Sequence, residues 1–175
     1  EVLPPTLNGL AYMNNASYSF DSGDGTNELK WDYQAIQYLR GPEIKGSPVI
    51  LEGQGELYRT LHSRASIYTG LPTVLGWDNH QGQQRGYGVN ISQRKNDIRY
   101  IYSTTDTELA LNLLGKYDVK YIYVGDIERH YYPKKGIAKF SEMVGNSLRL
   151  AYKNEQVTIY EVIPDNTRIE QPESL

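Results

Sequence analysis

The sequence predicts an α/β fold: a three-layer sandwich on a mostly parallel sheet of about five strands, with a C-terminal antiparallel hairpin. Two observations predict it. Segments with apolar residues at helical spacing alternate with short apolar runs that end in glycine or a polar loop, which is the rhythm of α/β units. The last two apolar runs are separated by only three polar residues, which is typical of a hairpin.

The first 27 residues are predicted to form an extended segment followed by a Gly-rich loop. Two prolines and a glycine within residues 4–9 disfavour a helix there. Residues 28–40 predict the first helix, since four apolar residues recur there at helical spacing. Asn27 or Asp32 offers an N-cap for this helix, and the Gly-Pro pair that follows ends it.

The middle of the chain predicts two strands, each followed by polar residues. The apolar runs 48–52 and 72–76 predict the strands. The helical spacing of apolar residues over 57–69 predicts the helix between them. A polar loop with a helical turn at 80–87 follows the second strand, and 97–103 predicts a further helix.

The second half continues the alternation. Thr105 and Glu108 form a capping-box pattern that predicts a helix over 105–115. Residues 119–124 predict the third strand. The remaining expected elements are a helical turn at 127–132, a helix at 136–144 and hairpin strands at 148–152 and 156–163. Residues 1–175 thus predict a single domain with an α/β core over 28–163 and a loose tail over 164–175.

Composition argues against some classes of function and favours others. The formal net charge is −3, so nothing indicates a nucleic-acid-binding surface. No apolar run is long enough to span a bilayer, and there is no cysteine for a disulfide or a thiolate metal site. The chain has 16 Tyr but only 2 Phe, which suits a sugar-binding or interface surface as well as a core whose hydroxyls reach water.

Polar side chains follow three of the predicted strands. The carboxyl ends of parallel strands share one edge of a sheet, where ligands bind in open α/β folds. The candidate binding residues there are Glu52, Arg64, Trp77, Asp78, His80, Arg85, Asp126 and Arg129. Trp77 could stack on a sugar ring, and the arginines could hold a phosphate. A hydrogen-bonded framework that fixes the loops explains the same residues, so these alternatives stay open.

Motifs for catalysis and cofactors are absent from the sequence. The three histidines show no metal-ligand spacing, and there is no Gly-rich phosphate loop or GxSxG. We therefore predict no metal, no cofactor and no catalytic residue in the isolated chain. A glycoside hydrolase using Glu52 and Asp126 is a third alternative, which requires both carboxylates to flank one pocket.

Several blocks of this sequence are similar to the extracytoplasmic C-terminal domain of the YYY family of multi-pass membrane proteins. The most specific is Thr69-Gly-Leu-Pro-Thr-Val-Leu-Gly-Trp77, followed by His80 and Arg85. Weaker matches include Ser47–Glu52 and Lys120–Gly125 with Glu128-Arg129. The family pattern, His-Glu and aromatic residues ahead of the arginine, is replaced here by Gln81, Gly82 and Gln84, which argues against a catalytic carboxylate in that loop.

That family resembles C-type glycosyltransferases, which use polyprenyl-phosphate sugars and hold their catalytic carboxylates in the membrane part. The resemblance implies that this chain is an accessory domain on the extracytoplasmic face of the cell membrane and is not catalytic alone. Its implied partners are the transmembrane portion of the same polypeptide and a sugar or lipid-linked sugar acting as acceptor or donor. Trp77, His80 and Arg85 would recognise the ligand, with Glu52 and Arg64 orienting them. The alternative is a free-standing carbohydrate-binding module.

Overall fold

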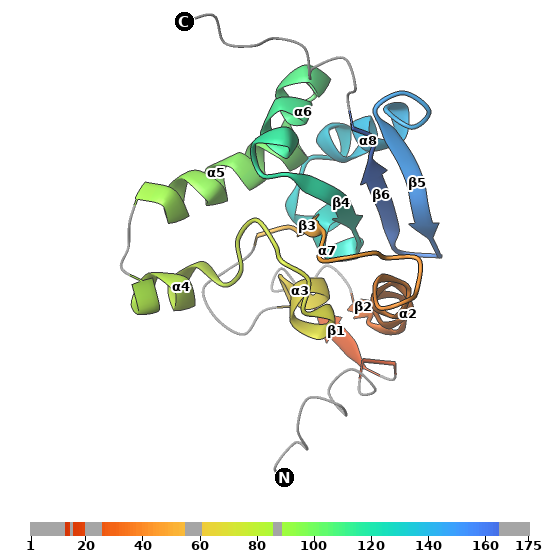
Figure 1. Ribbon diagram of the computed structural model, residues 1–175. Coiled ribbons are helices and arrows are strands. Elements are labelled where there is room, and N and C mark those ends of the chain that lie inside the picture. The colour runs from red at the N-terminus through yellow and green to blue at the C-terminus, as the bar shows by residue number, and fades with distance from the viewer. Residues whose placement is uncertain (1–12, 15, 20–25, 55–60, 86–88, 165–175) are drawn as a thin grey trace, which may run out of the picture.

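The computed structural model describes residues 13–14, 16–19, 26–54, 61–85 and 89–164 (Figure 1). The strands are β1 (Ser17–Ser19), β2 (Thr26–Glu28), β3 (Val49–Leu51), β4 (Val119–Val124), β5 (Leu148–Lys153) and β6 (Thr158–Val162). The helices are α2 (Lys30–Leu39), α3 (Arg64–Thr69), α4 (Asp78–Arg85), α5 (Val89–Ser103), α6 (Thr107–Lys116), α7 (Asp126–Tyr131) and α8 (Lys134–Glu142). None of the described helices is both long enough and apolar enough to cross a bilayer.

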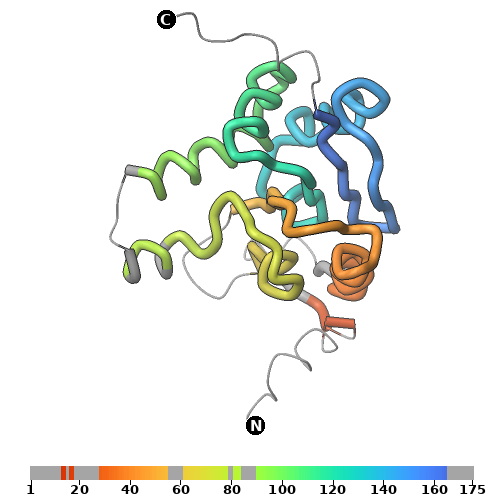
Figure 2. The backbone as a smooth tube through the Cα atoms, viewed as in Figure 1, coloured from red at the N-terminus to blue at the C-terminus, as the bar shows by residue number. Residues whose placement is uncertain are grey.

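The central sheet is mixed, not mostly parallel as the sequence predicted. Its strand order is β3-β4-β6-β5, and only β3 and β4 run parallel. The predicted strand at 72–76 makes a single bridge, in which Thr73 pairs with Ile50 and the Pro72 carbonyl accepts the Ile50 N–H. The backbone of this segment passes beside β3 (Figure 2). Pro72 has no N–H to donate, which prevents pairing before Thr73, and no second bridge follows Thr73 in the described residues. The sheet therefore has four strands in the described part of the chain instead of about five.

The three-layer arrangement is confirmed by two apolar cores on opposite faces of the sheet. Strand β4 alternates between them, with Tyr121 and Tyr123 in one core and Ile122 and Val124 in the other. The tyrosine side packs against α2 and α3, and the other side packs against α5, α6 and α8 (Figure 1). The predicted hairpin is also confirmed as β5 and β6, which pair antiparallel.

The N-terminal helix begins later than predicted, at Lys30, and neither Asn27 nor Asp32 caps it, because its N-cap is Leu29. Asp32 instead lies in the first turn with its side chain buried. Part of the predicted N-terminal loop, residues 26–28, is strand β2, which pairs with β1. The other predictions for residues 1–12 and 20–25, and for the tail beyond Pro164, lie outside the described residues.

Several helix ends differ from the predictions. Asp106, not Thr105, caps α6, and its Oδ1 accepts the Leu109 N–H at 3.0 Å. Helix α5 extends much further toward the N-terminus than the predicted 97–103. Only 64–69 of the predicted helix 57–69 is seen as α3, and 57–60 lies outside the described residues.

Helix α8 contacts the C-terminal end of α5 at very short range. A Cβ added to Gly136 would lie 2.3 Å from the Tyr102 carbonyl oxygen and 2.6 Å from that of Ser103. Lys139, also on α8, is buried and donates to the carbonyls of Ile101 and Gly136. A lysine at a helix C-terminus satisfies carbonyls that have no partner within their own helix. This contact holds α8 against α5, on the face of the sheet that carries Ile122 and Val124.

Candidate functional site

The carboxyl ends of β3 and β4 meet at one edge of the sheet, as predicted for parallel strands. Glu52 follows β3 directly, and Gly125 and Asp126 follow β4. Helices α2, α3 and α7 all reach this edge, and each contributes a buried charged side chain: Asp32, Arg64 and Glu128.

Arg64 is the centre of a buried ion network at this edge. Its Nε donates to Asp32 Oδ1 at 2.5 Å, while Nη1 and Nη2 donate to the two oxygens of Glu128 at 3.1 and 2.9 Å. The guanidinium carbon also lies 4.7 Å from the centre of the Tyr123 ring, whose hydroxyl donates to Asp32 at 2.7 Å. A bidentate Arg–carboxylate pair combines two parallel hydrogen bonds with charge attraction, so this geometry joins three helices to β4.

Glu128 extends the network into the backbone. Its Oε1 accepts the Gly53 N–H at 3.2 Å and its Oε2 accepts the Gly125 N–H at 2.8 Å, so one carboxylate holds the backbone just beyond both parallel strands. Burial alone would raise the pKa of Glu128, but the Arg64 charge and these hydrogen bonds outweigh it and hold the pKa below its usual range. Glu128 is therefore ionised at neutral pH and serves as a structural anion.

Glu52 caps helix α3 and is not bonded to the Arg64 side chain. Its two oxygens accept the N–H groups of Ala65 and Ser66 at 2.7 and 2.8 Å, which caps the first turn of α3. Burial raises the pKa of Glu52 to about 7, although Arg64 and the two backbone donors oppose the rise. The side chain is 1% exposed. A general acid or base needs access to substrate, so this burial argues against the hydrolase alternative that pairs Glu52 with Asp126.

We expect stability to depend on the protonation of Glu52. Because its folded pKa lies near 7 and its unfolded value near 4.5, the folded state retains a proton that the unfolded state releases. The free energy of unfolding should fall as pH rises through this window, by up to about 3 kcal/mol. Urea denaturation at pH 4.5 to 8 measures this as the difference between the unchanged chain and Glu52→Gln. A pH-independent difference would contradict the assignment.

The loop after the predicted second strand folds into α4. Trp77 is half-buried, and its indole N–H donates to the His62 carbonyl at 3.2 Å, which fixes the ring orientation. Asp78 is buried and pairs with Lys95 at 2.6 Å. His80 and Arg85 belong to α4, and their side chains lie outside the described residues.

The remaining two candidates lie just beyond β4, on α7. Asp126 and Arg129 form an ion pair at 3.2 Å, and Arg129 also donates to the Gln156 carbonyl in the turn between β5 and β6. Burial raises the pKa of Asp126 despite the neighbouring guanidinium. The structure thus places Glu52 at the first turn of α3, the helix that begins with Arg64, while Asp78 pairs with Lys95, and Asp126 and Arg129 pair with each other. The recognition roles of the eight residues stay predictions.

Two members of the network, Asp32 and Glu128, were missed as site residues. Glu128 occurs within a block that carries the sequence resemblance, and both residues lie on short helices beside apolar residues. An acidic residue on the buried face of a helix signals a hidden cation, and that signal was available for Asp32 beside Ala35 and Ile36.

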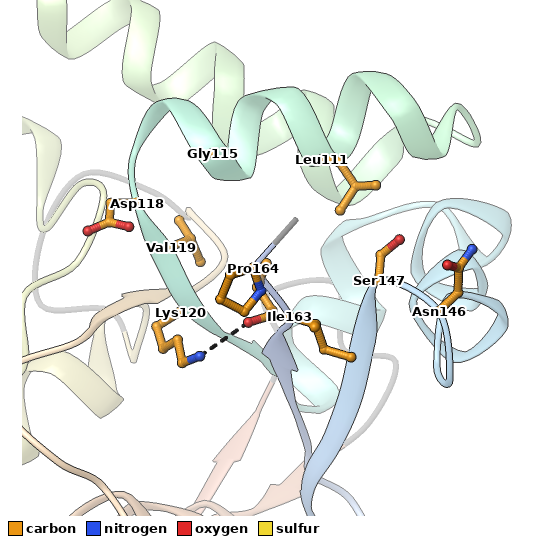
Figure 3. Close-up of a pocket in the computed structure, with 10 residues that line it drawn as sticks. Leu111, Gly115, Asp118, Val119, Lys120, Asn146, Ser147, Ile163 and Pro164 are labelled. Carbon is orange, nitrogen blue, oxygen red and sulfur yellow. Dashed lines mark hydrogen bonds between the residues drawn. The ribbon is translucent and has the colours of Figure 1, made fainter. Parts of the chain in front are cut away.

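Metal binding finds no support in the described part of the chain, where no three His, Asp or Glu side chains are grouped to hold an ion. A pocket of about 450 Å³ lies at the opposite, amino end of β4 (Figure 3). It is lined by Leu111, Val119 and Ile163 with Asp118, Lys120 and Asn146 at its margins, and Lys120 donates to the Val162 carbonyl there. None of the candidate residues whose side chains the structure describes lines this pocket.

Comparisons with known proteins do not assign this chain to a family. No family model matches the chain, and no curated protein matches it. Among solved structures, the C-terminal globular domain of an oligosaccharyltransferase from Archaeoglobus fulgidus aligns with 74% of this chain and 95% of its own, at 12% identity and a TM-score of 0.48. A likeness of this size establishes neither the fold nor the function, and the resemblance to the YYY family stays a prediction.

Proposed function

We propose that this chain is a non-catalytic accessory domain of a membrane-bound, glycosyltransferase-like protein on the extracytoplasmic face of the membrane. Its surface beyond the strand ends binds an acceptor or a lipid-linked sugar, or docks on the transmembrane part of the same polypeptide. The archaeal domain is too distant to support this proposal, which rests on the sequence resemblance and on one structural observation.

That observation is the internal pairing of the ionisable groups at the carboxyl edge. Arg64 is shared between Asp32 and Glu128, and both oxygens of Glu52 accept backbone N–H groups. Groups held in this way are buried and already satisfied, so they fit a rigid framework better than an acid–base pair. Such a framework is what a recognition surface needs beneath it, because pre-positioned groups lose little entropy on binding.

Trp77 is the residue through which this surface is best tested. The hydrogen bond to His62 holds the indole in one orientation while the residue stays partly exposed. Stacking of an aromatic ring on a ligand contributes about 1 kcal/mol. We expect Trp77→Ala to weaken binding of chitobiose or mannobiose about fivefold to tenfold in an NMR titration of the labelled chain.

Tyr100→Ala is the matched control, since Tyr100 is an exposed aromatic residue on α5 that is not among the candidate residues. It should leave the affinity unchanged. Equal weakening by both variants, or no chemical-shift change with any sugar tested, would remove sugar recognition at Trp77 and leave docking on the membrane part as the role of this surface.

The free-standing carbohydrate-binding module remains the second candidate, because the fixed orientation of Trp77 serves it equally well. The two differ in what the whole protein does. An accessory domain requires transfer activity in a longer protein that contains this chain, whereas a free-standing module binds sugar with no such activity anywhere in its polypeptide.

A further inference from the structure

A second pocket, of about 370 Å³, opens between α7, α8 and the β5–β6 hairpin. Its volume falls within the range of small-molecule sites. Two cationic side chains, Arg129 and Lys153, line it, and among the described residues no carboxylate does. The pocket adjoins the carboxyl edge of the sheet, since Val124, the last residue of β4, forms part of its wall.

The Arg129 side chain, which lines the pocket, is held in place by two hydrogen bonds. Its Nη1 bonds to Asp126 and to the Gln156 carbonyl, so the guanidinium is held between α7 and the hairpin turn. The Asp126 carboxylate does not line the pocket. Lys153 forms no ion pair with any carboxylate in the described part of the chain. Asp126 thus compensates the charge of Arg129, and Lys153 supplies the uncompensated positive charge at this end of the pocket.

A β-bulge places Lys153 on this face. Leu150 pairs with Tyr160 and Lys153 pairs with Thr158, so the extra residue on β5 is Ala151. Residues three apart on a regular strand point to opposite faces, but one inserted residue restores them to the same face. Leu150 and Lys153 therefore both line the pocket, on the face that α8 covers.

The other end of the pocket is apolar. Ile137 and Val144 come from α8 and its C-terminal end, and Leu150 from β5. Val144 is 41% exposed and Leu150 is 46% exposed, which is high for large apolar side chains that line the same pocket. The pocket thus offers two cations at one end and uncovered apolar surface at the other.

We propose that this pocket binds an amphipathic anion, with a phosphate group between Arg129 and Lys153 and an apolar stem along Ile137, Val144 and Leu150. Arginine and lysine are the usual protein partners of phosphate, and the apolar end excludes a purely polar ligand as the best fit. The inference rests on the proposed function in naming a lipid-linked sugar as the natural source, because such a molecule joins a phosphate to an apolar chain.

The experiment titrates the full chain with three probes: farnesyl phosphate below its micelle concentration, farnesol and inorganic phosphate. Isothermal calorimetry should give saturable binding of farnesyl phosphate that is at least tenfold tighter than that of the other two probes. Lys153→Gln should weaken farnesyl phosphate binding about tenfold, and Lys135→Gln, which alters a lysine of α8 outside the pocket, should not.

A second pair of variants tests the apolar end. Leu150→Asn should weaken farnesyl phosphate about fivefold and leave inorganic phosphate unaffected, while Leu109→Asn, at an exposed leucine on α6, should change neither. Equal affinities of Lys153→Gln and Lys135→Gln, or inorganic phosphate binding as tightly as farnesyl phosphate, would overturn the proposal. Sugar binding that is sensitive to Trp77→Ala would still support the proposed function in that case, so the two failures are distinguishable.

Discussion

Arg64→Met is expected to remove about 3–5 kcal/mol from the free energy of unfolding, the cost of leaving buried charges without their partner. Asp32 and Glu128 would then lie in the interior without the Arg64 cation, and the two helices that carry them would lose their ion pairs with α3. Domains of this size are stable by only about 5–15 kcal/mol, so the variant should be largely or marginally unfolded at 37 °C.

Urea denaturation monitored by circular dichroism measures the effect. Arg149→Met is the matched control, because Arg149 forms an ion pair with Glu161 but its side chain is 68% exposed. Exposed pairs contribute about 0–1 kcal/mol, so the control should stay near the unchanged chain. Arg64→Lys should recover only part of the loss, since an ammonium group cannot make the bidentate contact. Equal losses for Arg64→Met and Arg149→Met would show that the network is not the support of this edge.

Gly136→Ala is expected to destabilise the chain by about 2 kcal/mol, because a close backbone contact outweighs a gain in helix propensity. The new Cβ would meet the carbonyl oxygens of Tyr102 and Ser103, which are backbone atoms and cannot rotate away. Overpacking of this kind costs about 1–3 kcal/mol or more, against a gain of about 1 kcal/mol from replacing glycine in a helix.

Gly115→Ala is the control on a neighbouring helix. No atom lies within 4 Å of a Cβ at Gly115, so only the propensity term applies and the melting temperature should rise slightly. A Gly136→Ala variant that melts as high as Gly115→Ala would mean that α8 can move away from α5 at no cost in stability.

The regular parts of this fold were predictable because their signals are local. Strand β4 is a run of apolar and tyrosine residues that ends in glycine, and the hairpin is marked by its three-residue turn. The order of the strands was not predictable, because the pairing of β4 with β6 joins residues far apart in sequence. The predicted strand at 72–76 was wrong in extent, because it pairs with β3 through the single bridge at Thr73, and tertiary pairing of this kind is not marked in the local sequence.

The position of some polar residues was predictable, but their partners were not. The shared carboxyl edge followed from parallel strands, and Glu52 caps the helix that begins with Arg64. The partners of Arg64 could not be inferred, because Asp32 and Glu128 are 32 and 64 residues away from it and only the folded chain brings them together. Lys153 was likewise hidden, since its face of the sheet depends on a bulge that no sequence pattern marks.

We expect this chain to bind a sugar-bearing ligand without acting on it. Incubation of the purified chain with a radiolabelled polyprenyl-phosphate sugar and a soluble acceptor, followed by chromatography of the recovered label, tests binding and the lack of transfer at once. The label should be retained by the protein and recovered as intact donor. Label transferred to the acceptor or released as free sugar would contradict it, and would require a catalytic group that the buried network at the carboxyl edge does not supply.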